Sequence, residues 1–192
     1  MQHPLKLAIL GSTRGTDMQA IIDAINAHVL DARIGVVVSN KADAYILERA
    51  RDHNIPALFL DPQGMSREEY DARLSTTVEQ YTPDLILLIG YMKILSSIFV
   101  REWKGKIWNV HPSLLPKFAG GMDLNVHQAV LDAHETETGC TIHEVDEGVD
   151  SGKIILQKSC VVEPTDTADT LKIKVQKLEG EAFVEAISAF KI

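Results

Sequence analysis

The chain has 192 residues, of which 45% are hydrophobic and 24% charged, and this ordinary globular usage argues against disordered and fibrous classes. Nineteen lysines and arginines against 27 acidic residues give a formal net charge of −8, so we expect no nucleic-acid partner, because phosphates require a basic face. Two cysteines without CxxC spacing, an N-terminus without a signal-peptide pattern and the lack of a long apolar run predict a cytoplasmic protein with no membrane partner.

The first half of the chain alternates between buried strands and amphipathic helices. Met18, Ile21, Ile22, Ile25 and Val29 share one side of a helix, and Ser66 begins a capping-box pattern. Continuous apolar or β-branched runs predict strands buried on both faces. The predicted elements are a strand at Leu5–Leu10, a helix at Met18–Val29, a strand at Arg33–Ser39, a helix at Ala42–His53, a short strand at Ala57–Leu60, a helix at Ser66–Tyr81, and strands at Asp84–Ile89 and Lys106–Val110.

The second half changes character. It predicts a helix at Val126–Ala133, two strands at Cys140–Val145 and Lys153–Val162 that pair antiparallel, and a long helical pattern over Asp166–Phe190. Together these elements predict an α/β fold: a Rossmann-like, doubly wound, mostly parallel sheet with a C-terminal antiparallel strand extension and a long final helix. We expect one domain over residues 1–192, with ligands bound at the carboxyl ends of the parallel strands.

Two polar stretches carry candidate chemistry. Asn109 and His111 end a predicted strand and point to the same side, although a packed amide and histidine at a strand end is an equally ordinary structure. The acidic stretch with Asp146, Glu147 and Asp150 reads as a solvated turn or a metal loop, and its spacing is not that of a calcium loop. His127 and His134 have no acidic or cysteine partner at ligand spacing, so we predict no bound metal.

The two stretches together resemble the folate-dependent formyltransferases, and most of all the glycinamide ribonucleotide formyltransferase family of purine synthesis. The motifs are Asn109-Val-His-Pro-Ser-Leu-Leu-Pro116 and, further on, Gly139-Cys-Thr-Ile-His-Glu-Val-Asp-Glu-Gly-Val-Asp-Ser-Gly152. The resemblance covers nearly the whole chain. It includes Gln19-Ala-Ile-Ile, Ser39-Asn-Lys-Ala-Asp, Ser66-Arg-Glu-Glu-Tyr-Asp, Gly90-Tyr-Met-Lys-Ile-Leu and Ile154-Ile-Leu-Gln.

The resemblance implies a reaction and its catalytic residues. The amine of glycinamide ribonucleotide attacks the formyl carbon of 10-formyltetrahydrofolate, and an oxyanion forms. Asn109 and protonated His111 then donate hydrogen bonds to that oxyanion. Asp150 is expected beside His111, where a carboxylate raises the imidazole pKa and helps to carry the proton of the attacking amine.

The resemblance also implies the substrate sites. The phosphate of the acceptor is expected on Gly15, Thr16 and Asp17 at a helix N-terminus, and Glu179 is expected at its amino end. The implied partners are these two small molecules, with the protein a monomer or homodimer. The residues expected to bind the folate are Arg67, Met92, Lys93, Ile94, Leu95, Asn109 and Asp146.

The sequence departs from the family at the first glycine loop. Thr13-Arg-Gly-Thr-Asp17 lacks one glycine and has an acid where the family has asparagine, which repels a phosphate unless Asp17 caps the helix and points away. The connection over residues 119–125 is also longer than is usual in the family. Three other functions stay open: that of another small-molecule N-formyltransferase, that of a formyltetrahydrofolate hydrolase, and that of a non-catalytic nucleotide-binding regulatory domain.

Overall fold

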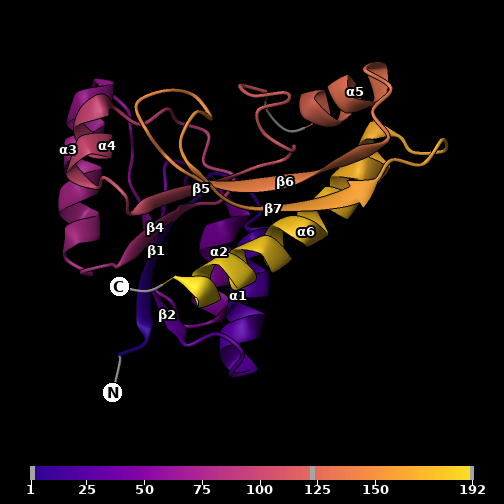
Figure 1. Ribbon diagram of the computed structural model, residues 1–192. Coiled ribbons are helices and arrows are strands. Elements are labelled where there is room, and N and C mark those ends of the chain that lie inside the picture. Colours follow the sequence, from indigo (N-terminus) through magenta and orange to yellow (C-terminus); the bar gives the residue numbers. More distant parts are fainter. Residues whose placement is uncertain (1–2, 122–123, 191–192) are drawn as a thin grey trace.

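A computed structural model describes residues 3–121 and 124–190, so Met122 and Asp123 of the lengthened connection lie outside the described residues. Its seven-stranded sheet has the order β3-β2-β1-β4-β5-β6-β7 (Figure 1). Strands β1 to β5 pair in parallel, and β6 and β7 extend the sheet antiparallel, as the sequence predicts. The strands are β1 (Leu5–Leu10), β2 (Ala32–Ser39), β3 (Ala57–Phe59), β4 (Leu85–Leu88), β5 (Ile107–His111), β6 (Glu137–Glu144) and β7 (Ile154–Val161).

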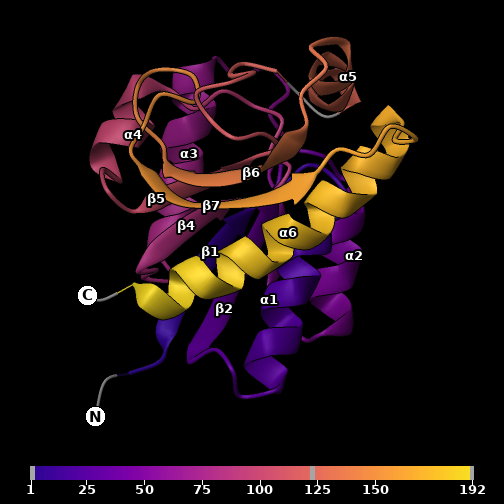
Figure 2. The same ribbon diagram turned by 45° about the vertical axis from the view of Figure 1, so that its right-hand side comes forward.

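Helices cover both faces of the sheet, which explains why strands such as β1 read as continuous apolar runs. Leu7 and Ile9 pack with α1, α2 and α6 on one face, while Ala8 and Leu10 pack with α3 and α4 on the other (Figure 2). The fold is therefore doubly wound, and the prediction of fold class is confirmed. The helices are α1 (Thr16–Asn26), α2 (Tyr45–Asp52), α3 (Arg67–Glu79), α4 (Ser97–Glu102), α5 (Leu124–Asp132) and α6 (Ala168–Ala189).

The predicted elements are all present, with ends that differ by a few residues, and two differences have clear causes. Helix α1 ends at Asn26 and the chain turns at His28 (φ 58°), so Val29 leaves the helical face and is 68% exposed; its predicted place on that face is wrong. The sequence pattern also gave no sign of α4, a six-residue helix too short for apolar periodicity, whose N-cap is the Ser96 hydroxyl.

The strand order reverses beside β1. Strand β2 lies on one side of β1 and β4 on the other, so the connections leaving β1 and β4 diverge at their carboxyl ends. Ser12, just after β1, joins these loops: its hydroxyl donates to Asn40 Oδ1, 2.5 Å away, and accepts from the backbone N–H of Met92 at 2.9 Å. The sheet edge thereby brings together segments that lie far apart in the sequence.

Candidate active site

Asn109 lies in the middle of β5 and faces His143 of β6. The two residues are register partners in the antiparallel ladder, and Asn109 Nδ2 is 3.1 Å from His143 Nε2. Since His143 Nδ1 donates to the Glu144 carbonyl at 2.9 Å, its Nε2 is left to accept from the Asn109 amide. One amide hydrogen of Asn109 is therefore fixed by His143, and the second stays available for another acceptor.

His111 is held between a carboxylate and a carbonyl. Its Nδ1 lies 3.1 Å from Asp150 Oδ2, and its Nε2 donates to the carbonyl of Phe118 at 3.0 Å. The other carboxylate oxygen of Asp150 lies 3.5 Å from His143 Nε2. The fold thus brings the predicted trio of Asn109, His111 and Asp150 into one group, together with His143.

The ionisation of His111 differs from the expectation. Burial of the ring lowers the pKa of His111 below its ordinary value, although the Asp150 carboxylate and the Phe118 carbonyl act in the opposite direction. Asp150 does raise this pKa, as expected, but burial lowers it by more, because the His111 side chain is only 4% exposed. Protonated His111 would donate from both ring nitrogens, to Asp150 and to Phe118, whereas the neutral ring serves one of them.

Asp150 is the ionised member of the group. Burial opposes its charge, but the contact with His143, the hydrogen bond from the Gly120 N–H and the neighbouring His111 ring leave the pKa of Asp150 below its ordinary value. The Gly120 N–H donates to Asp150 Oδ2 at 2.8 Å. Because Phe118 contacts His111 and Gly120 contacts Asp150, the segment after β5 closes over both side chains.

The first glycine loop ends at Gly15, the N-cap of α1. Gly15 has φ 68° and a Cβ there would lie 2.5 Å from Ile46 Cγ1, so both conformation and packing require glycine. Thr16 is exposed at the helix N-terminus, as an anion site requires. Arg14, the residue before Gly15, has its guanidinium 5.6 Å from the centre of the Tyr45 ring.

The sequence predicts a phosphate site here only if Asp17 caps α1 and points away from a bound phosphate, and the structure meets this condition only in part. Asp17 does not cap the helix, since Gly15 holds that position, but its side chain is buried, and Oδ1 finds no hydrogen-bond partner among residues 3–121 and 124–190. Burial raises the pKa of Asp17 to about 7. Glu179 of α6 is also buried, and both acids help burial raise the pKa of the Cys140 thiol to about 12. Glu179 thus lies within electrostatic range of the same thiol as Asp17.

The residues expected to bind folate lie on several separate segments. Met92 and Ile94 are exposed after β4, Leu95 is buried, and Lys93 Nζ lies 4.8 Å from the centre of the Tyr70 ring. Two others, Arg67 and Asp146, lie outside the segment after β4. Arg67 is exposed at the start of α3, and Asp146 accepts from the Gly148 N–H and the Ser151 hydroxyl.

His143 is the residue that the sequence analysis passed over. It lies inside the motif that ends at Asp150, yet only the β5–β6 register places it opposite Asn109. Thr141, two residues earlier, holds the segment after β5: its hydroxyl donates to the Ser113 carbonyl at 2.7 Å and accepts from the Leu115 N–H at 3.0 Å. The peptide bond Leu115–Pro116 in this segment is cis.

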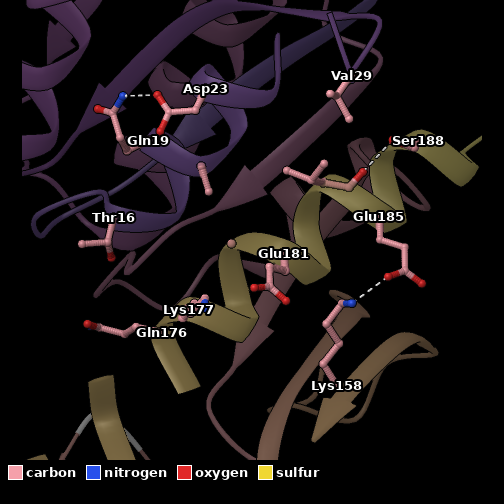
Figure 3. A pocket seen from close by; sticks show the side chains of 13 residues that line it. Thr16, Gln19, Asp23, Val29, Lys158, Gln176, Lys177, Glu181, Glu185 and Ser188 are labelled. Carbon is pink, nitrogen blue, oxygen red and sulfur yellow. Dashed lines mark hydrogen bonds and ion pairs between the residues drawn. The ribbon is translucent and has the colours of Figure 1, made fainter. Parts of the chain in front are cut away.

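A groove in the described part of the chain lies away from this group. It has a volume of about 940 Å³ and runs between α1 and α6, past the Lys158–Glu185 ion pair (Figure 3). Thr16 is at its edge, but Asn109, His111 and Asp150 are not in its lining. Within the described ranges, no three histidine, cysteine or acidic side chains are grouped to hold a metal ion, and no helix is long and apolar enough to cross a bilayer.

A doubly wound α/β sheet that presents an amide, two imidazoles and a carboxylate at its carboxyl edge defines an enzyme class suited to transfer at a carbonyl carbon. The sequence profile of the formyl transferase family matches residues 5–187. The chain therefore belongs to the formyl transferase family.

Named relatives cover nearly all of the chain. It is 43% identical over 190 residues to the trifunctional purine biosynthetic protein adenosine-3 of Drosophila melanogaster, but spans only 14% of that protein's length. It is 41% identical over 186 residues to the phosphoribosylglycinamide formyltransferase of Haemophilus influenzae, with 96% of this chain and 86% of that protein covered. The structure of glycinamide ribonucleotide transformylase 1 from Symbiobacterium toebii superposes with a TM-score of 0.93 at 37% identity, over 98% of this chain and 88% of that one.

Proposed function

We propose that the protein transfers the formyl group of 10-formyltetrahydrofolate to the amine of glycinamide ribonucleotide. The observation that carries the proposal is the grouping of Asn109, His111 and Asp150 at the carboxyl end of β5, with Asp150 Oδ2 3.1 Å from His111 Nδ1. The named relatives that match most of this chain support the choice of acceptor.

Two donors serve the developing oxyanion. The amine nitrogen attacks the formyl carbon, the carbonyl oxygen becomes an oxyanion, and the bond from that carbon to N10 of the folate then breaks. The free amide hydrogen of Asn109 is one donor, because the other is committed to His143. The Nε2–H of His111 is the second, so the substrate oxygen replaces the Phe118 carbonyl as its acceptor.

Asp150 transfers the proton. The attacking amine loses a proton as the carbon–nitrogen bond forms, and N10 gains one as it leaves. A carboxylate with a lowered pKa is ionised at neutral pH, so Asp150 accepts the amine proton and passes it through a water molecule to N10, which returns Asp150 to its ionised form. Before it takes up this proton, the ionised Asp150 also stabilises a protonated His111.

The two substrates are held by local groups, since the whole chain is acidic. The N–H groups at the start of α1, at Gly15, Thr16 and Asp17, suit the acceptor phosphate. Asp17 weakens this attraction only when it is ionised, and its pKa of about 7 keeps much of it neutral in neutral solution. We assign Glu179 to the ribonucleotide side.

We assign the folate donor to the segment after β4 and to the acidic loop. Met92 and Ile94 supply exposed apolar side chains for a flat ring, and Asp146 of the acidic loop supplies a polar partner. Arg67 and Lys93 supply positive charge for the carboxylates of the donor.

A single assay tests the proposal. Purified protein is mixed with 10-formyltetrahydrofolate, and loss of the formyl group is followed with and without glycinamide ribonucleotide. We expect release only when the acceptor is present. Release without any acceptor would identify a hydrolase, while release that needs a different amine would identify another N-formyltransferase. No release with any acceptor would indicate a non-catalytic binding domain.

A further inference from the structure

Asp150 belongs to the loop that joins β6 to β7, residues 145–153. The base of this loop is closed, because the Glu144 N–H donates to the Lys153 carbonyl at 2.9 Å. A Cβ on Gly152 would lie 1.8 Å from the Glu144 carbonyl oxygen, so the two arms cross in close contact. Within the loop, Asp146 Oδ1 accepts from Gly148 and Ser151 and folds the chain back on itself.

The backbone of Asp150 is held in an unfavourable conformation. Its φ is 51°, in the left-handed region that side chains other than glycine rarely adopt. Such a residue stays in place only where its surroundings fix it more strongly than its own backbone preference. The contacts of its carboxylate with His111 and the Gly120 N–H supply part of this restraint.

A second restraint connects the loop to helix α4, through Glu147, three residues before Asp150. Glu147 accepts two parallel hydrogen bonds from Arg101 of α4, from Nε at 2.9 Å and from a terminal nitrogen at 2.7 Å. Hydrogen bonds from Arg101 and from Ser97 lower the pKa of Glu147 to about 2, so this carboxylate is charged at every working pH. The loop between β6 and β7 lies beside α4 in both ribbon views (Figures 1 and 2).

Helix α4 is itself firmly seated on α3. Asp71 Oδ2 accepts from the Ser96 N–H at 2.5 Å, and the Trp103 indole N–H donates to the Ser75 hydroxyl at 2.8 Å. Asp71, Ser96, Ser75 and Trp103 are all buried. Arg101 therefore projects from a fixed support, and its fork of donors fits a carboxylate in one orientation.

We propose that Arg101 and Glu147 are positioning residues that hold the 145–153 loop against α4, so that the Asp150 carboxylate stays between His111 and His143. Both side chains are largely exposed, at 67% and 46%, so the pair contributes little to global stability. Its effect is instead on the population of one loop geometry. The kinetic consequence rests on the proposed formyl transfer, whereas the consequence for the His111 ring does not.

The test uses Arg101→Ala with two readouts. Nuclear magnetic resonance of the His111 ring is expected to show changed chemical shifts and a changed pKa, because the Asp150 carboxylate, which raises this pKa, and the loop that buries the ring, which lowers it, both move. Turnover of 10-formyltetrahydrofolate with glycinamide ribonucleotide is expected to fall about twofold to fivefold, the change in loop population that corresponds to the free energy of an exposed ion pair. The KM for the acceptor should change little, since the phosphate loop is untouched.

Charge exchange and a neighbouring acid provide the controls. The double variant Arg101→Glu/Glu147→Arg should recover both turnover and the His111 pKa, and 1 M NaCl should slow the wild type more than Arg101→Ala. Glu102→Ala, an exposed change on the same helix, should behave as the wild type. An unchanged His111 pKa and turnover in Arg101→Ala would overturn the positioning role, as would a charge-exchanged variant no better than the single one. An inactive wild type would instead overturn the proposed function, and the titration would still test the positioning.

Discussion

The amide nitrogen of Asn109 lies 3.1 Å from Nε2 of His143, its register partner on β6. This contact fixes the rotation of an amide whose free hydrogen is proposed to meet the oxyanion. His143→Ala should lower kcat about tenfold, because the amide then rotates freely and loses its preorganisation. Steady-state kinetics measure the effect, and KM for both substrates should stay close to the wild-type values.

The exposed His134 provides the control for this substitution. His134→Ala removes an exposed imidazole from the turn between α5 and β6, outside the group of Asn109, His111, His143 and Asp150, and should leave kcat unchanged. A His143→Ala enzyme with wild-type kcat and a raised KM would show that His143 serves binding and not the orientation of Asn109.

Removal of the catalytic groups themselves should cost far more. Asn109→Ala and His111→Ala should each lower kcat by about 10²–10³, the usual loss when one donor at a developing oxyanion is removed. Asp150→Ala should lower kcat by about 10²–10⁴, the usual loss when a group that transfers the proton is removed. Circular dichroism and thermal unfolding should confirm that each variant is folded. Turnover near the wild-type level from His111→Ala would refute the proposed mechanism.

The sequence supports the prediction of the fold because the signals are local. Runs such as Leu5–Leu10 are apolar on both faces, and their alternation with helical spacing implies a doubly wound sheet. Similarly, the Ser66–Glu69 capping box marks the start of α3, and both of its hydrogen bonds are present. Helix α4 escaped prediction because six residues give no measurable period.

Contacts between distant segments are what the sequence leaves open. Proximity of Asp150 to His111 followed from the family resemblance, but the partners of His111 Nε2 and of Asn109 depend on the Phe118 segment and on strand register. The direction of the His111 pKa could not be foreseen either, since it depends on how deeply the ring is buried.

Gly15 provides a test of the acceptor site. Gly15→Ala places a side chain at φ 68° and within 2.5 Å of Ile46 Cγ1, so it should destabilise the fold by about 1–3 kcal/mol and shift the start of α1. Because the N–H groups of α1 are proposed to bind the phosphate, KM for glycinamide ribonucleotide should rise more than KM for the folate. Kinetics with each substrate varied in turn separate the two effects.

Gly64 gives a matched comparison. It has φ 78°, yet a Cβ there meets nothing within 4 Å, so Gly64→Ala carries the backbone strain without the contact with Ile46. It should destabilise the protein by a smaller amount and leave both KM values unchanged. Equal KM values for Gly15→Ala and the wild type would place the phosphate elsewhere.

Asp17 should make folding stability depend on pH. Its pKa is 3.8 in the ordinary state and about 7 when buried, so between these values the folded protein holds a proton that the unfolded chain has lost. The contribution of Asp17 to stability is therefore complete below pH 4 and is lost as the pH rises through 7. At about 1.4 kcal/mol per pKa unit, the total is roughly 4 kcal/mol.

Asp17→Asn removes this titration, so urea unfolding between pH 5 and pH 8 should show the wild type losing about 2–3 kcal/mol relative to the variant. Asp23→Asn, an exposed change on the same helix, should follow the wild type. Ionisation of Asp17 should also weaken binding of the acceptor. An ionised Asp17 beside a bound phosphate raises KM for the ribonucleotide above pH 7, and the variant should not show this rise. Parallel stability curves for the wild type and Asp17→Asn would show that Asp17 stays ionised throughout and that burial does not govern its charge.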